Sequence, residues 1–192
     1  MALAITIFGG SRVLPDSAEY AAARQLGEKL AEHGFEVVTG GYSGVMEAVS
    51  RGAKERGGRV IGVTVEVVAR TFERVPNEFL DQEVQTAALL ERIDKLVELG
   101  DAFVVLPGGA GTLAELGIAW NLAIFGVLRD KPLIVVGAGW ERVLRTMIEH
   151  LHTVESDLRF LHLVPTVEAA VNTLTDLLLP RGTDGHQLHR TA

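Results

Sequence analysis

The chain has 192 residues, no cysteine and a formal net charge of −7, from 18 basic and 25 acidic side chains. This length allows one domain, or two small ones at most, and 47% hydrophobic with 22% charged residues is ordinary globular composition. The lack of cysteine excludes disulfide scaffolds and thiolate metal sites, and the acidic balance disfavours nucleic acid or anionic membranes as partners. Residues 1–10 lack the features of a signal peptide and no stretch reaches the ~18 apolar residues of a membrane span, so we expect a cytoplasmic protein.

Short apolar runs alternate with helical patterns along the chain. In chain order we predict a strand over 4–8, a helix over 18–31, a strand over 35–39, a helix over 45–55, a strand over 60–65, a long connection over 67–81, a helix over 86–99, a strand over 102–106, a helix over 111–128, a strand over 133–136, a helix over 140–151, a strand over 161–164 and a helix over 166–179. Strands that alternate with helices indicate βαβ units and one parallel sheet. The prediction is an α/β fold, a Rossmann-like doubly wound parallel sheet with helices on both faces. It forms a single domain over 1–179, followed by a flexible tail over 180–192.

Three glycine clusters fall at predicted carboxyl ends of strands: Gly9-Gly10, the segment 40–44 and the segment 107–112. Ligands of parallel sheets bind at this edge, and a glycine loop before a helix lets backbone amides approach an anion. Tight turns alone would explain one such loop, but three at one edge favour a phosphorylated ligand. The chain has no G-x-x-x-x-G-K-[ST] motif, which disfavours Walker-type nucleotide hydrolases.

Thr112 and Glu115, three residues apart, allow two interpretations. Thr-x-x-Glu is a capping box, in which Thr112 is the N-cap residue and Glu115 bonds back to its amide. The same spacing also directs Glu115 toward whatever binds at the start of this helix. A carboxylate beside a phosphate would repel it unless it had another task, such as stabilising a developing cation.

The segment 107–115, PGGAGTLAE, resembles the PGGxGTxxE motif of the Lonely Guy (LOG) family, whose members are often labelled lysine decarboxylase-like. The segment 40–46 is similar to the second glycine motif of this family, GGxxGLM, and Gly10-Ser11 is similar to its first loop. The resemblance implies a Rossmann-like, usually dimeric, nucleotide-binding protein. It also implies hydrolysis of a nucleoside 5′-monophosphate, in some members a cytokinin ribotide, to the free base and ribose 5-phosphate.

The resemblance further implies the site residues. The family has an arginine fifteen residues before the proline of the motif, which corresponds to Arg92 and implies Arg92 and Glu115 as the catalytic pair. Without that spacing, a surface arginine paired with nearby acids is an alternative for Arg92. The implied substrate and phosphate positions are Gly10, Ser11, Gly40, Gly41, Gly44, Met46, Gly108, Gly109, Gly111 and Thr112. Glu115 would stabilise the ribosyl cation or orient the attacking water, and Arg92 would neutralise ligand charge or hold the base.

The chain departs from the family pattern on the side of the base. The lysine that commonly follows the arginine is Ile93, the preceding Met-His is Leu89-Leu90, and a later acidic residue is Ile118. These changes do not affect the positions implied for the phosphate and the ribose of the substrate, but they leave the identity of the base undetermined.

Other residues suggest smaller roles. Arg12 could reach a phosphate or simply face water, and Arg70, Glu73 and Arg74 in the long connection could cover the site.

We expect no metal and no cofactor. A pyridoxal enzyme needs a Schiff-base lysine, and the four lysines, Lys29, Lys54, Lys95 and Lys131, all lie outside the glycine loops. The expected partners are a small-molecule nucleotide and a second copy of the chain. Helix surfaces rich in Leu and Ala suggest self-association, and the family resemblance implies that the assembly is a homodimer. The alternative function is a non-catalytic nucleotide or molybdenum-cofactor binding or carrier protein, which would not need the chemistry of Glu115.

Overall fold

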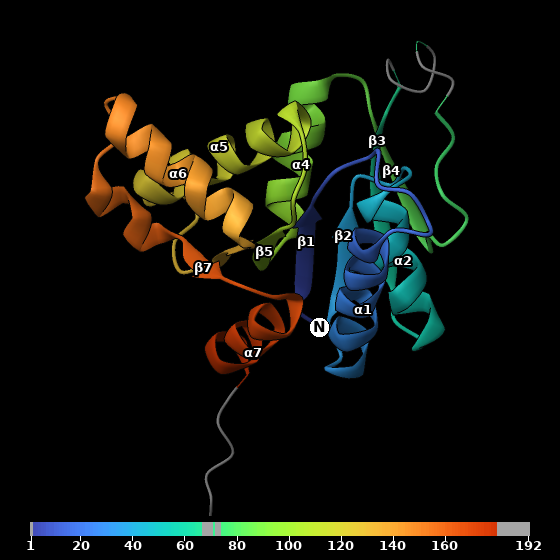
Figure 1. The fold of residues 1–192 in the computed structure, drawn as a ribbon. Coiled ribbons are helices and arrows are strands. Elements are labelled where there is room, and N and C mark those ends of the chain that lie inside the picture. Colours follow the sequence, from blue (N-terminus) through green and yellow to red (C-terminus); the bar gives the residue numbers. More distant parts are fainter. Residues whose placement is uncertain (1, 67–70, 72–73, 180–192) are drawn as a thin grey trace, which may run out of the picture.

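A computed structural model describes residues 2–66, 71 and 74–179, and in this part of the chain seven parallel strands form one sheet in the order β4-β3-β2-β1-β5-β6-β7. The strands are β1 (Ala4–Phe8), β2 (Glu36–Thr39), β3 (Val60–Val65), β4 (Gln82–Thr86), β5 (Ala102–Val105), β6 (Leu133–Val136) and β7 (His162–Val164). The helices are α1 (Ala18–Glu32), α2 (Val45–Glu55), α4 (Leu89–Leu99), α5 (Ala110–Ile124), α6 (Ala138–His150), α7 (Val167–Leu178) and the 3₁₀ helix η1 (Glu155–Phe160). The predicted doubly wound α/β fold is confirmed (Figure 1).

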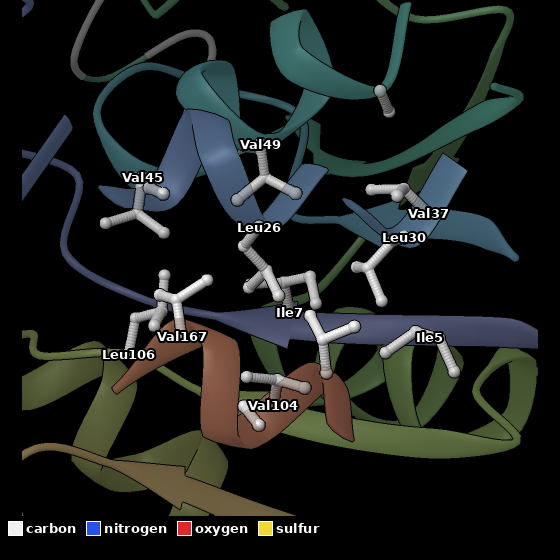
Figure 2. Close-up of a cluster of buried hydrophobic side chains, with 14 of the residues drawn as sticks. Ile5, Ile7, Leu26, Leu30, Val37, Val45, Val49, Val104, Leu106 and Val167 are labelled. Atoms are coloured by element: carbon white, nitrogen blue, oxygen red, sulfur yellow. The ribbon is translucent and has the colours of Figure 1, made fainter. Parts of the chain in front are cut away.

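Alternate side chains of the strands point to opposite faces of the sheet and fill two separate cores. On β1, Ile5 and Ile7 join the core that is covered by α1, α2 and α7, whereas Phe8 joins the core covered by α4, α5 and α6. Figure 2 shows the first core, in which Leu26 of α1 and Val49 of α2 lie over the strands. Because both faces are covered, the central strands are continuous apolar runs in the sequence.

Strand β4 was not predicted, because its sequence lacks an apolar run. Val84 is the one apolar residue in Gln82–Thr86, and the strand lies at the edge of the sheet with most of its side chains exposed. Polar side chains on an edge strand discourage pairing with another chain, and they remove the pattern by which buried strands are predicted. The helix predicted over 86–99 is therefore wrong at its start, since Thr86 ends β4 and α4 begins at Leu89.

Other boundaries differ less. The helix predicted over 111–128 ends at Ile124, because Gly126 has a φ of +71° that interrupts the helix. Helix η1 was not expected, and the remaining strands and helices agree with the prediction to within one or two residues at each end. In the predicted long connection, residues 74–81 contain no helix or strand, and 67–70 and 72–73 lie outside the described residues.

The predicted single domain over 1–179 stays a prediction, as does the tail, because residues 180–192 lie outside the described part. Within the described ranges, none of the helices combines the length and the apolar character that a membrane span requires.

Helices α1 and α2 pack closely because each presents a glycine to the other. A Cβ atom at Gly27 would collide with the backbone of Val49, and one at Gly52 would collide with the backbone of Arg24. Backbone atoms cannot rotate away as the end of a side chain can, so the two helices could accept a methyl group here only by moving apart.

We therefore expect Gly52→Ala to lower the free energy of unfolding by about 1–3 kcal/mol, because the added methyl group overpacks the α1–α2 contact. Gly139→Ala is the matched control, since a Cβ atom there would meet nothing within 4 Å in helix α6. This control should leave the free energy of unfolding unchanged or raise it slightly, because alanine favours a helix over glycine. Urea unfolding followed by circular dichroism measures both variants, and equal effects would contradict the close packing.

Candidate active site

A cavity of about 480 Å³ lies at the carboxyl edge of the sheet, where the loops after β1, β2 and β5 meet the first turns of α4 and α5. Eight of the predicted site residues line it: Gly10, Ser11, Met46, Arg92, Gly109, Gly111, Thr112 and Glu115. The other four, Gly40, Gly41, Gly44 and Gly108, lie in the same loops but are not among the described residues that line the cavity. The predicted convergence of the three glycine clusters at one edge of the sheet is confirmed.

The three glycine loops are hydrogen-bonded to one another. The amide of Gly10 donates to the carbonyl oxygen of Pro107 at 3.1 Å, and the amide of Val45 donates to the carbonyl oxygen of Gly10 at 2.9 Å. The strand register pairs Phe8 with Val105, so the loops after β1 and β5 leave the sheet side by side. A ligand held by one of these loops therefore lies within reach of the others.

Two of these four glycines, Gly44 and Gly108, are needed for the close approach of the loops. Gly44 has a φ of +74°, and a Cβ atom there would lie against the backbone of Gly10 and Ser11. A Cβ atom at Gly108 would lie against the side chain of Thr112 and the amide of Gly10. These glycines thus shape the wall that the neighbouring residues form.

Helix α5 points its N-terminus at the cavity. Gly109 is the N-cap residue, and its carbonyl oxygen accepts from the amide of Leu113 at 2.9 Å. The capping box considered for Thr112 and Glu115 is therefore wrong, because Thr112 already lies inside the helix. The amides of the first turn have no acceptor within the helix, and the positive end of the helix dipole lies there. A Cβ atom at Gly111 would meet nothing within 4 Å, so the amides border space that an anion can fill.

Arg92 of α4 is buried, and three different elements hold its guanidinium. Its side chain is 9% exposed. Nε donates to the carbonyl oxygen of Val63 at 2.8 Å, Nη2 to that of Gly40 at 3.0 Å, and Nη1 to Oε1 of Glu115 at 3.3 Å. The alternative of a surface arginine paired with nearby acids is wrong, because the side chain is buried. Strand β3, the loop after β2 and helix α5 fix the guanidinium in one orientation.

The loop after β2 is built around this guanidinium. A Cβ atom at Gly40 would collide with Nη2 of Arg92 and would lie 2.7 Å from Sδ of Met46. The Cζ atom of Arg92 lies 5.8 Å from the ring centroid of Tyr42, which is within the range of a cation–π interaction. Gly40 and Met46, which the family resemblance implies as substrate positions, therefore also contact the arginine.

Glu115 is an unusually weak acid for a glutamate. Its side chain is 12% exposed, and burial raises its pKa to about 7, although Arg92 offsets part of the rise. At neutral pH the carboxyl group is therefore divided between its protonated and ionised forms. A group that titrates in this range can both carry charge and exchange a proton near pH 7, which is typical of acid–base residues in active sites.

Several cavity residues are not among the predicted site residues. Tyr42, at a variable position of the second glycine motif, lines the cavity together with Val65 and Leu89. Arg12 and Arg74, for which the sequence suggested a role without a fixed position, line it as well. Arg70 and Glu73 lie outside the described residues. A residue such as Arg74 carries no motif or periodicity that would place it at the cavity, because it follows a stretch with no regular pattern.

Comparisons with known proteins agree with the motifs. A family model described as the SLOG cluster4 family matches residues 2–170. The cytokinin riboside 5′-monophosphate phosphoribohydrolase of Mycobacterium tuberculosis is 34% identical over 115 residues, which are 59% of this chain and 60% of that protein. A probable cytokinin riboside 5′-monophosphate phosphoribohydrolase of Oryza sativa, LOGL5, is 36% identical over 113 residues, 58% of this chain and 45% of that protein. Each match thus spans less than two thirds of the relative.

Among solved structures, the molybdenum cofactor binding protein of Rippkaea orientalis has a TM-score of 0.72 and 22% sequence identity. The superposition covers 92% of this chain and 97% of that chain. At this identity the likeness concerns the fold alone.

The raised pKa of Glu115 should make the free energy of unfolding depend on pH. The folded protein keeps this proton up to about pH 7, whereas the ordinary pKa of a glutamate is 4.5, so between these values the native state binds more protons and stability falls as pH rises. Glu115→Gln cannot ionise, so it should gain about 1–3 kcal/mol over the unsubstituted protein between pH 4.5 and pH 8. Urea unfolding across this range measures the difference. Glu149→Gln, at a side chain that is 68% exposed, is the control, and a pH-independent effect of Glu115→Gln would contradict the raised pKa.

Proposed function

The chain belongs to the SLOG cluster4 family, and we propose that it is an N-glycosyl hydrolase that splits a nucleoside 5′-monophosphate into the free base and ribose 5-phosphate. The observation that carries the proposal is the buried ion pair of Arg92 and Glu115, which lies in one cavity with the free amides at the start of α5. The mycobacterial and rice relatives, which are named for this activity, support it.

The order of the loops along the sheet edge matches the order of the parts of a nucleotide. The edge runs from β5 through β1 and β2 to β3, and at about 4.8 Å between strands these three spacings amount to about 14 Å. That length accommodates a nucleoside monophosphate. We place the 5′-phosphate at the amides of 108–112 with Gly10 and Ser11, the ribose at Glu115, and the base toward Tyr42 and Val65.

In this arrangement Glu115 acts on the ribose. Cleavage of the N-glycosidic bond passes through an oxocarbenium-like state, as in glycoside hydrolysis. The bond between C1′ and the base breaks, an oxygen from water bonds to C1′, and the protons of that water end on the base and on the new hydroxyl group. Ionised Glu115 stabilises the positive charge that develops on the ribose and orients the water. The low-dielectric surroundings that raise its pKa also strengthen its interaction with that charge.

Arg92 positions Glu115 and balances its charge. The guanidinium stays protonated, so it is not a proton donor to the leaving base. Three of its N–H groups already donate to Val63, Gly40 and Glu115, which leaves it little freedom to follow a substrate. Its main contribution is therefore a fixed positive charge beside a carboxylate that must ionise in a buried place.

Lysine decarboxylase chemistry does not fit this cavity. All four lysines lie in the described part of the chain, and none of them is among the residues that line the site. Lys54 instead pairs with Asp81, and Lys95 pairs with Glu98. A Schiff base with pyridoxal phosphate has no lysine to form on here.

We also propose that the protein is a homodimer that associates through the layer of α4, α5 and α6. This layer and the turns that follow its helices carry most of the exposed large apolar side chains of the described residues: Leu89, Leu90, Leu113, Phe125, Val127, Val143, Leu151 and Val154. Burying such side chains against a second copy is favourable. A cytoplasmic location and the absence of a nucleic-acid partner stay predictions.

The function is tested with Glu115→Gln, which keeps the shape of the side chain and removes its charge. We expect release of ribose 5-phosphate from at least one nucleoside 5′-monophosphate, and a loss of kcat of about 100-fold or more in the variant. Mass spectrometry of a panel of common 5′-monophosphates and isopentenyladenosine monophosphate identifies both products. Glu141→Gln is the control, because this side chain on α6 is 47% exposed and is not among the described residues that line the cavity.

Each outcome of this assay decides between the functions. Release of product that Glu115→Gln retains in full would contradict the role of Glu115. Tight binding of a nucleotide or of the molybdenum cofactor without any product would instead support the carrier function. Unfolding measurements on the same samples separate a lost site from a lost fold.

The dimer is tested with the double substitution Leu90→Glu and Phe125→Glu, at side chains that are 72% and 74% exposed. We expect this variant to elute as a monomer, because two charges per copy would be buried at the interface. Leu177→Glu on α7, in the other helix layer, should leave the dimer intact. Size-exclusion chromatography with light scattering measures the mass, and an unsubstituted protein that is already monomeric would overturn the proposal.

A further inference from the structure

The geometry points to Arg74 as the residue that selects the base, and to a 6-oxopurine nucleotide, such as inosine or guanosine 5′-monophosphate, as the preferred substrate class. This inference rests on the proposed function, because it takes the orientation of the nucleotide from it. The inference names the chemical group that the base must present, which neither the motifs nor the relatives specify for this chain.

Arg74 reaches the cavity from the end opposite the helix amides. It lies in the connection between β3 and β4, and three residues later this connection is fixed to the loop after β2. The amide of Asn77 donates to the carbonyl oxygen of Gly41 at 2.8 Å, and Nδ2 of Asn77 donates to that of Tyr42 at 3.0 Å. Since β3 and β2 are separated from β5 by β1, Arg74 belongs to the end of the cavity where the base lies.

The other described side chains at this end have no hydrogen-bonding capacity to offer a base. The hydroxyl group of Tyr42 donates to the carbonyl oxygen of Val65 at 3.1 Å and accepts from its amide at 3.0 Å. Val65 and Leu89 present apolar side chains, and Met46 lies against the guanidinium of Arg92. Apart from Arg74, the described part of the wall around the base is therefore apolar or already hydrogen-bonded.

Arg74 is different, because it makes no hydrogen bond or ion pair with any residue in the described ranges and yet lines the cavity. A guanidinium carries five N–H donors in a planar fork and no acceptor. It can thus bind only a group that accepts hydrogen bonds, and it binds best where two acceptors lie side by side.

This requirement separates the purines. Guanine and hypoxanthine present O6 and N7 as two adjacent acceptors, whereas adenine presents N7 beside the N6 amino group, which is a donor. An arginine that forms both hydrogen bonds with O6 and N7 would face one donor with another in adenine. We expect kcat/KM to be about 10- to 100-fold higher for the 6-oxopurine.

The test compares inosine 5′-monophosphate with adenosine 5′-monophosphate, which differ only at the 6-position and the adjacent N1. Arg74→Gln should lower the ratio of their kcat/KM values by at least about tenfold, because the glutamine amide can donate to N7 and accept from N6 of adenine. Arg12→Gln is the matched control, since it makes the same change at the other unpaired cavity arginine, in the loop beside the phosphate. It should weaken both nucleotides alike and leave the ratio unchanged.

Two results would overturn the inference while leaving the hydrolase function intact. One is equal or better turnover of adenosine or isopentenyladenosine monophosphate by the unsubstituted protein, and the other is an unchanged ratio in Arg74→Gln. If no nucleotide is cleaved at all, the proposed function fails instead. Isothermal titration of Glu115→Gln with the same two nucleotides then tests the base preference separately from turnover. If Arg74 selects the base, inosine monophosphate should bind more tightly than adenosine monophosphate even when neither is cleaved.

Discussion

A buried guanidinium must have its N–H donors satisfied, and much of this site follows from how the chain meets that demand at Arg92. Two of its partners are backbone carbonyl oxygens, one from β3 and one from the loop after β2, and the third is Glu115. Carbonyl oxygens cannot lose their acceptor character by titration. They anchor the arginine independently of protonation, so among its hydrogen bonds to the described residues the ion pair with Glu115 is the one whose strength changes when the partner titrates.

The same demand explains the glycine at position 40. The guanidinium comes so close to the backbone that a Cβ atom there would overlap Nη2. The glycine motif after β2 therefore makes room for the guanidinium of Arg92, in addition to any role in binding a phosphate. The loop after β5 differs, since Gly109 and Gly111 border open space and leave the amides of α5 free for a ligand. Two similar glycine clusters at one edge of the sheet thus have different roles: the one after β2 accommodates Arg92, and the one after β5 leaves backbone amides free for a ligand.

The central strands and the glycine loops of the site could be predicted from the sequence, because each has a strong local pattern. Central strands that are covered on two faces are apolar runs in the sequence, and glycine clusters mark the βα turns. What could not be predicted has little local signal: β4 is a polar edge strand, and Arg74 follows a stretch without periodicity. The cap of α5 was undecided for another reason. Thr112 and Glu115 fit a capping box by spacing, and only the contact between Glu115 and Arg92, 23 residues earlier, decides where the carboxylate goes.

The charge of the cavity is opposite to that of the chain. The protein as a whole carries a formal charge of −7, yet the described lining holds three arginines, at 12, 74 and 92, and a single carboxylate that titrates near pH 7. Charges farther apart than about 8 Å are largely screened at physiological salt, so a small anion inside the cavity experiences the arginines and the helix amides rather than the acidic surface. A long polyanion would contact that surface along its length. The distribution therefore favours a small phosphorylated ligand over a polymeric one, whereas the acidic net charge alone argues against the polymer without indicating the small ligand.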